Sequence, residues 1–250
     1  MKLVDVVNYL DEYLKVMEIA DSSLNGLVIE NSGEVNKIGF AVDFSKRAIK
    51  EAVKDNVNML IVHHGPYWGK VVPLSGYFYK RMKEMIKHDI ALYAVHLPLD
   101  IHPEVGNNAY AMKLLGLKDT EEFGDYHGIK LGRKFKFKKP MKREEFKKLL
   151  EEKIGGEAIL WDFGKEEIQT GAYVSGDAIS LLEEAIKERV DVYITGEPKH
   201  SAYWVAAENE INVMFLGHYT SERVGLLALK EHLEKKFKID TIFIEAPTGY

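Results

Sequence analysis

Residues 60–66 read Leu-Ile-Val-His-His-Gly-Pro, an apolar run that ends on two adjacent histidines and then enters a turn. An apolar run of this length after a helical pattern is typical of a buried parallel strand. In open α/β sheets, the carboxyl ends of such strands are where binding and catalytic sites form. The two imidazoles are therefore candidate metal ligands. A chance pair of histidines in a loop is the alternative, and only further ligands elsewhere in the chain can decide between the two.

The composition limits the kinds of protein that this chain can be. Its 250 residues suffice for one large domain or two moderate ones. Because there is no cysteine, disulfides are excluded and a transition metal must bind His, Asp or Glu. The net formal charge of −5 neither requires nor excludes a nucleic-acid partner. No apolar run approaches the roughly 18 residues of a membrane span, and the first residues lack the apolar core of a signal peptide, so we expect a cytoplasmic protein with no membrane partner.

The first half of the chain predicts an amphipathic helix followed by a βαβ unit. Apolar side chains at helical spacing cover residues 3–19, namely Val6, Val7, Leu10, Leu14 and Met17. A strand at residues 37–42 is followed by Ser45, a candidate N-cap for a helix over residues 46–55. That helix leads into a strand at residues 58–62. A right-handed crossover of this kind joins parallel strands.

The second half repeats this pattern. Glu-Ala-Val-Lys at residues 51–54 recurs as Glu-Ala-Ile-Lys at residues 184–187, a shift of 133 positions that needs no gap in the flanking strands. All βαβ units look alike to some degree, but an ungapped match with a shared core favours internal duplication. We predict two interlocked, internally duplicated α/β domains with mixed sheets flanked by helices. The first domain spans residues 1–125 and is joined by a C-terminal strand in residues 239–250, and the second domain spans residues 126–238.

Two further apolar strands each run into a histidine that is followed four residues later by a carboxylate. Residues 90–95 lead to His96 and Asp100, and residues 211–216 lead to His218 and Glu222. Where a strand turns into a helix, residues four apart lie on one face of the first helical turn, and the helix N-terminus favours a carboxylate there. If the strand ends of the two halves face each other, six donors converge: His63, His64, His96, Asp100, His218 and Glu222. Six nitrogen and oxygen donors suit two divalent ions. The alternative is that each group is an independent helix cap or structural histidine, which would require the same coincidence at three strand ends.

Together, five motifs resemble the Nif-three-like family, commonly labelled GTP cyclohydrolase I type 2: Asn25-Gly26-Leu27, His63-His64-Gly65-Pro66, His96-x-x-x-Asp100, Tyr193-Ile194-Thr195-Gly196-Glu197 and Gly217-His218-Tyr219-x-Ser221-Glu222. The resemblance covers nearly the whole chain, in the compact form without the middle domain that many bacterial members carry. It implies a dinuclear metal site in the inter-domain cleft and a toroidal homo-hexamer. One departure is Pro66-Tyr67-Trp68, where relatives often have a plainer sequence; it bears on the shape of the substrate and not on metal binding.

The resemblance also implies roles for individual residues. The metal ligands are His63, His64, Asp100, His218 and Glu222, with Glu222 as the bridge between two ions and His96 as either a ligand or a nearby residue. The donor set is compatible with Zn, Fe, Mn, Co or Ni. The leading hypothesis is a metal-dependent hydrolase for a small nucleotide-like or phosphate-containing substrate, in which Glu222 and His96 are catalytic and His200 is a second candidate to contact substrate. The rivals are a ring that binds DNA or other nucleic acid around structural metals, and a metal chaperone or store.

Residues 130–139, Lys-Leu-Gly-Arg-Lys-Phe-Lys-Phe-Lys-Lys, form a basic ribbon. Strict alternation places Phe135 and Phe137 on one face and lysines on the other. One interpretation is a strand that faces nucleic acid, since clustered cations gain affinity from counterion release. The other is an edge strand protected by lysine, as natural sheets commonly have. We favour the edge strand, although a ring of six copies would create a basic rim.

Overall fold

The computed structural model describes residues 1–250, which form two compact units. Unit 1 comprises Met1–Val105 and Leu226–Ala246, and unit 2 comprises Gly106–Gly225 and Pro247–Tyr250. The chain returns from unit 2 to unit 1 within the long helix α9 (His218–Phe237). The sequence pattern places the first division after residue 125 and assigns α9 to the second domain. The structure divides earlier because the strand that begins at Thr120 pairs within the unit 2 sheet.

Unit 1 contains a five-stranded sheet of order β1-β4-β3-β2-β11. Its strands are β1 (Gly26–Ile29), β2 (Lys37–Asp43), β3 (Met59–His64), β4 (Ala91–Ala94) and β11 (Asp240–Phe243). All pairings are parallel except that of β1 with β4. Helix α2 (Lys46–Lys54) joins β2 to β3, and its N-cap Ser45 accepts a hydrogen bond from Ala48 N at 3.1 Å. The predicted βαβ unit, its cap and the added C-terminal strand are all present.

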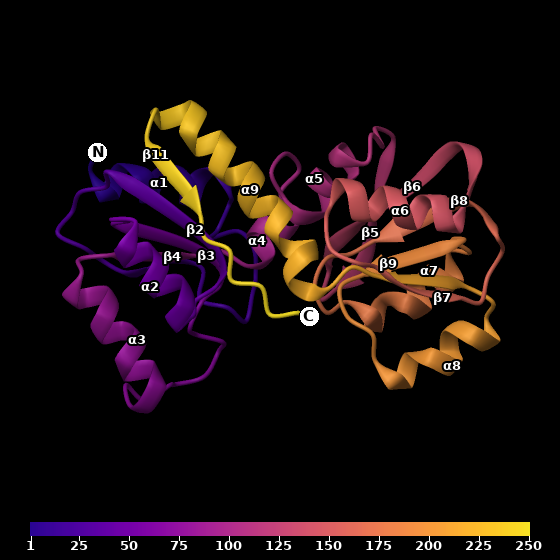
Figure 1. Cartoon of the computed structure of the whole chain (residues 1–250), viewed down its shortest axis with the longest axis horizontal. Helices are drawn as coiled ribbons and strands as arrows, with labels where there is room; N and C mark the ends of the chain where they lie inside the picture. The colour runs from indigo at the N-terminus through magenta and orange to yellow at the C-terminus, as the bar shows by residue number, and fades with distance from the viewer. The chain divides into compact units, whose positions relative to one another are not determined.

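Helices cover the unit 1 sheet on both faces. Helices α2 and α3 (Gly76–Lys87) lie side by side on one face (Figure 1), where Ile49 and Phe78 pack with Leu92 in one apolar cluster. Helix α1 (Leu3–Tyr13) lies on the other face, where the Tyr93 hydroxyl donates to Asp11 Oδ1 at 2.7 Å. Because adjacent strand residues point to opposite faces, Leu92 and Tyr93 belong to different layers.

The opening helix is shorter than its apolar pattern predicts. Helix α1 ends at Tyr13, and Lys15 has a left-handed backbone with φ of 53° that stops the helix. The expected inward face of Met17 was wrong, because this side chain is 90% exposed. The same helix α1 contacts the C-terminal end of α9, which belongs to unit 1: the ring of Phe237 packs edge-on against Tyr9.

Unit 2 contains a six-stranded sheet of order β5-β6-β8-β9-β10-β7. Its strands are β5 (Thr120–Tyr126), β6 (Ile129–Lys142), β7 (Ile159–Asp162), β8 (Glu167–Tyr173), β9 (Val192–Thr195) and β10 (Asn212–Phe215). The connecting 3-10 turn η1 (Ile179–Leu181) and helices α7 (Leu182–Lys187) and α8 (His200–Glu208) cover one face. Helices α5 (Asn107–Leu114) and α6 (Arg143–Lys153) cover the other (Figure 1).

The two units confirm the predicted duplication. The series β2-α2-β3-α3-β4 in unit 1 and β8-α7-β9-α8-β10 in unit 2 both consist of parallel strands connected by helices. In each unit, the last strand of the series pairs with an antiparallel neighbour in the sheet. These pairs are β4 with β1 in unit 1 and β10 with β7 in unit 2. The units differ at the first strand, where β11 is parallel to β2 but β6 is antiparallel to β8.

The basic ribbon occupies a position that the sequence did not predict. Strand β6 pairs with both β5 and β8, so the expected edge strand was wrong and β5 is the edge. The acidic sequence of residues 120–126 does not indicate a strand, although this segment forms β5 and pairs with β6. Phe135 and Phe137 are buried, as the alternation predicts. No helix of this chain has the length and apolar character that crossing a membrane requires.

Candidate metal centre

Unit 1 gathers four of the predicted donors at one edge of its sheet. His63 and His64 are the last residues of β3, and His96 follows the neighbouring strand β4. The three imidazoles each offer a ring nitrogen within 4.8 Å of the others. Asp100, at the end of the short helix α4 (Leu97–Asp100), places Oδ2 3.5 Å from His63 Nε2. We call these four side chains the unit 1 cluster.

Each imidazole of the unit 1 cluster is fixed through its Nδ1 atom. His63 Nδ1 lies 2.9 Å from the Val95 carbonyl oxygen, to which it can only donate. His64 Nδ1 lies 2.9 Å from Asp43 Oδ1, and His96 Nδ1 lies 3.0 Å from Asp21 Oδ2. A proton held on Nδ1 leaves the Nε2 lone pair for a metal, and metal-binding histidines are usually oriented in this way. The cluster therefore has the hydrogen-bond arrangement of a metal site.

Asp21 is a residue that sequence reasoning missed. Besides His96, its carboxylate accepts hydrogen bonds from Ser23 N, the Asn25 side chain and Leu97 N, each at 3.0 Å. Burial by itself would raise the pKa of Asp21, but the hydrogen bond from His96, the charge of that imidazole and the other donors hold the pKa below its usual range. The side chain is therefore a carboxylate that orients His96. The Asn25 side-chain oxygen also accepts a hydrogen bond from the His96 backbone N–H at 2.7 Å. The asparagine of the Asn25-Gly26-Leu27 motif therefore helps to position His96.

Trp68 borders the unit 1 cluster. Its ring centroid lies 4.9 Å from that of His96 and 5.9 Å from that of His64. The indole N–H donates to the Gly65 carbonyl at 3.0 Å, which ties the ring to the turn after β3. The aromatic residue in the unusual Pro-Tyr-Trp segment is thus an apolar wall beside two candidate ligands.

Unit 2 brings together the remaining two predicted donors. His218 is the first residue of α9 and Glu222 lies one turn later, with 3.1 Å between His218 Nε2 and Glu222 Oε2. His218 Nδ1 lies 2.5 Å from Glu197 Oε1, so this imidazole is also oriented through Nδ1. We call His218 and Glu222 the unit 2 pair. The role of Glu197 is a second feature that the sequence did not predict, although it belongs to the turn after β9.

Glycine allows the loops of unit 2 to approach α9 closely. Gly176 has a φ of +68°, and a Cβ at this position would overlap Glu222 Oε1. A Cβ at Gly196 would lie 2.9 Å from the His218 Cα atom. Both positions follow parallel strands of the sheet, so the fold buries Glu222, which is 4% exposed, against backbone.

The histidine and the carboxylate of each His-x-x-x-Asp/Glu motif are arranged differently in the two units. His218 and Glu222 form the predicted i, i+4 pair on one helix face. In unit 1, His96 precedes α4 and is oriented by Asp21, while Asp100 lies against His63. His200, the other candidate for substrate contact, is exposed at the first position of α8.

The donor chemistry fits divalent transition ions. All donors are imidazole nitrogens and carboxylate oxygens, and four imidazoles have their Nδ1 atoms engaged by oxygen acceptors. Such sets bind Zn, Fe, Mn, Co or Ni without selecting among them. Each unit by itself therefore has candidate metal ligands that are already oriented.

Comparison with known proteins gives matches over the full length of the chain. Residues 1–249 match the family described as Duf34/NIF3 (NGG1p interacting factor 3). Proteins named GTP cyclohydrolase 1 type 2 homolog are 44% identical over 246 residues in Pyrococcus horikoshii, covering 98% of each chain, and 42% identical over 249 residues in Archaeoglobus fulgidus, covering 100% of each. The crystal structure of TTHA1606 from Thermus thermophilus superposes with a TM-score of 0.93 at 35% identity, covering 100% of each chain.

Proposed function

The chain belongs to the Duf34/NIF3 family, and we propose that it is a metal-dependent hydrolase that binds two divalent ions. The observation that carries the proposal is the orientation of the candidate ligands. Three imidazoles in unit 1 and one in unit 2 are fixed through Nδ1, and a carboxylate lies beside His63 and another beside His218. Side chains that are already oriented by hydrogen bonds reduce the free-energy cost of assembling a metal site.

The residues that would hold the two ions are His63, His64, Asp100, His218 and Glu222, and Glu222 would serve both ions. The unit 1 cluster supplies enough donors for one four-coordinate ion but not for two with open positions. The proposal therefore requires the unit 1 cluster and the unit 2 pair to act on the same two ions. His96 is either a fourth ligand in unit 1 or a neighbour that contacts substrate.

The chemistry follows from what these groups do. When bound, two divalent ions lower the pKa of water and stabilise negative charge on a phosphate or carbonyl oxygen. Glu222 lies one turn into α9, on the same helix face as His218. Asp21 holds His96 at Nδ1, so His96 can hold a proton at Nε2 for a leaving group. Trp68 would exclude water from one side of the substrate.

A nucleotide-like or phosphate-containing substrate is the class that we propose. The relatives in Pyrococcus horikoshii and Archaeoglobus fulgidus carry the name of a GTP cyclohydrolase homologue, which supports a nucleotide-like ligand. The proposal includes a homo-hexamer in the cytoplasm, as the family resemblance implies. Light scattering of the purified chain measures the number of copies directly.

The alternative is a toroidal nucleic-acid-binding protein whose basic ribbon contacts DNA. The contacts of the ribbon do not favour it. Lys130 lies 3.4 Å from Glu184, and Lys134 lies 2.6 Å from Glu188 and 3.2 Å from Glu121. Ion pairs within the protein leave less positive charge for phosphates, so we retain the hydrolase as the main proposal.

A reconstitution screen tests the proposal. The chain is stripped with a chelator, reloaded separately with Zn, Fe, Mn, Co or Ni, and assayed against phosphoesters and nucleotides. We expect turnover only in the reloaded samples and its loss in Glu222→Gln. The matched control is Glu231→Gln, an exposed glutamate on the same helix α9. If the reloaded chain holds its metal but turns over no substrate, a metal store or chaperone replaces the hydrolase.

A further inference from the structure

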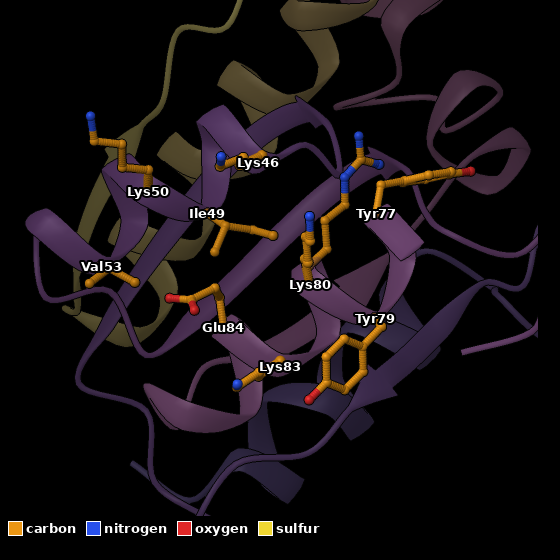
Figure 2. Close-up of a pocket in the computed structure, with 10 residues that line it drawn as sticks. Lys46, Ile49, Lys50, Val53, Tyr77, Tyr79, Lys80, Lys83 and Glu84 are labelled. Atoms are coloured by element: carbon orange, nitrogen blue, oxygen red, sulfur yellow. The ribbon is translucent and has the colours of Figure 1, made fainter. Parts of the chain in front are cut away.

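A groove of about 680 Å³ lies between α2 and α3 in unit 1. Five cationic side chains, two tyrosines, two aliphatic residues and one glutamate line it, and Figure 2 shows them projecting from both helices. None of these residues belongs to the unit 1 cluster. We call this the α2–α3 groove.

The α2–α3 groove carries positive charge that the protein does not neutralise. Its cations are Lys46, Lys50, Lys80, Arg81 and Lys83, and the ion pairs of α2 and α3 involve none of them. The carboxylates of these two helices pair with other cations, Glu51 with Lys54 and Glu84 with His88 at the end of α3. Glu84 is the one carboxylate in the lining. A local excess of cations in a chain of net charge −5 indicates an anionic partner.

Two tyrosines in the α2–α3 groove are unusually exposed. Tyr77 is 70% exposed and Tyr79 is 45% exposed. Each lies one turn before a cation on α3: the Arg81 guanidinium is 5.1 Å from the Tyr77 ring centroid, and the Lys83 ammonium is 5.8 Å from that of Tyr79. Helix α3 therefore presents two pairs of an aromatic ring and a cation. Arg81 is held in place because it also donates to the Phe44 carbonyl at 2.9 Å.

The base of the groove is apolar and fixed. Ile49 is 3% exposed and packs in the same cluster as Phe78 of α3, and Val53 packs against that cluster. Figure 2 shows Ile49 between the lysines of α2 and the side chains of α3. The floor and Arg81 are therefore fixed, while the exposed lysines Lys50, Lys80 and Lys83 at the rim extend into solvent.

We propose that the α2–α3 groove binds single-stranded nucleic acid without sequence preference. A cationic groove that follows the phosphates, together with aromatic rings on which bases stack, is the arrangement that such proteins use. Unpaired bases can reach Tyr77 and Tyr79, whereas duplex bases are stacked on one another. The cations sit on long flexible side chains, which neutralise phosphates but do not read bases. An acidic peptide would satisfy the lysines but gives no reason for two exposed rings.

This inference is independent of the metal centre. The groove uses side chains of α2 and α3 only, so binding should persist when all metal is removed with a chelator. Failure of the hydrolase proposal would leave the groove unaffected, and the reverse also holds.

The test measures fluorescence anisotropy of a labelled oligothymidylate of about 12 nucleotides in chelator-containing buffer. The groove variant is the triple Lys50→Glu, Lys80→Glu and Lys83→Glu. The matched control is the triple Lys136→Glu, Lys138→Glu and Lys139→Glu on β6, exposed lysines that undergo the same charge change. We expect the groove variant to weaken binding by more than about tenfold and the control by less than about twofold, since only the groove makes phosphate contacts.

A second variant tests stacking separately from charge. Tyr77→Leu with Tyr79→Leu keeps apolar bulk but removes the aromatic rings. Binding should weaken by at least about fivefold, at the lower limit for loss of one stacked base, with the salt dependence unchanged. All substituted side chains are exposed, and a thermal melt checks that each variant is folded.

Four outcomes would overturn the proposal. The first is absence of binding by the wild type. The second is a control variant that loses as much affinity as the groove variant. The third is duplex DNA that binds as tightly as the single strand. The fourth is an oligoglutamate that displaces the oligonucleotide at matched charge while the leucine variant binds like the wild type, which would assign the groove to an acidic peptide.

Discussion

The two units share one arrangement of strands and helices but carry different side chains at equivalent strand ends. At the end of β3, unit 1 has His63 and His64, whereas just after β9 unit 2 has Gly196 and Glu197. The first strand end supplies candidate ligands, and the second supplies a carboxylate that orients His218. The shared fold determines where a polar group is placed, while the residue at that position determines whether it can bind metal or only orient a ligand.

The units also differ in how many donors they hold. The unit 1 cluster has four donors and the unit 2 pair has two. Removing one donor therefore removes a larger fraction of the candidate metal ligands in unit 2 than in unit 1. The largest effects of substitution are expected in unit 2.

Glu222→Gln should have the largest effect. The amide keeps the shape of the side chain but is a poor bridge between cations, so we expect activity to fall by at least about a hundredfold while some metal stays bound. Turnover and metal content are measured on the same preparation. Full activity in this variant would show that the site is structural.

His64→Ala and Asp100→Ala should each lower the metal content without unfolding the protein. The strands that carry the cluster are packed by apolar residues such as Leu60 and Val62, which do not depend on the ions. Metal per chain is measured beside a thermal melt, with His200→Ala as the exposed control. Retention of two ions by the double variant would contradict the ligand assignment.

Asp43→Asn and Glu197→Gln compare the residues that orient imidazoles in the two units. Loss of such a partner typically costs about 10- to 100-fold in metal affinity. Asp43 orients one of three imidazoles in unit 1, whereas Glu197 orients the single one in the unit 2 pair, so Glu197→Gln should have the larger effect. Competition with a chromogenic chelator measures the affinities. A larger loss in Asp43→Asn would reverse the comparison.

Gly176→Ala should have a smaller effect, on stability as well as on metal. The left-handed backbone costs an alanine about 1–2 kcal/mol, and the added Cβ would displace the Glu222 carboxylate. Gly33→Ala is the control, because its φ is +102° but no atom lies within 4 Å of a Cβ there. Urea unfolding should show both variants destabilised, with metal affinity lowered only in Gly176→Ala. An equal change in affinity would show that the space beside Glu222 does not matter.

The features that the sequence predicted are those with a local signal. Apolar runs and turns located β3, β4 and β10, and the ungapped shift of 133 positions located the duplication. The N-cap at Ser45 and the inward faces of Phe135 and Phe137 followed from spacing alone. Each of these depends on residues that are close in the chain.

The features that the sequence did not predict depend on distant residues. Asp21 orients His96 from 75 positions away, and nothing in the loop around it indicates that role. Strand β5 is acidic, so its partner β6 was taken for an edge. Helix α9 passes from unit 2 to unit 1 without a change in its sequence pattern, which is why the division between the domains was placed elsewhere.

The most direct test of the account is the number of metal ions per chain when the whole unit 2 pair is removed. Elemental analysis by mass spectrometry is applied to the wild type and to the double variant His218→Ala with Glu222→Ala after equilibration with one divalent metal. If both units act on the same two ions, the wild type will hold two ions and the double variant fewer than two, although the unit 1 cluster is intact. Two ions bound with unchanged affinity in the double variant would contradict the account.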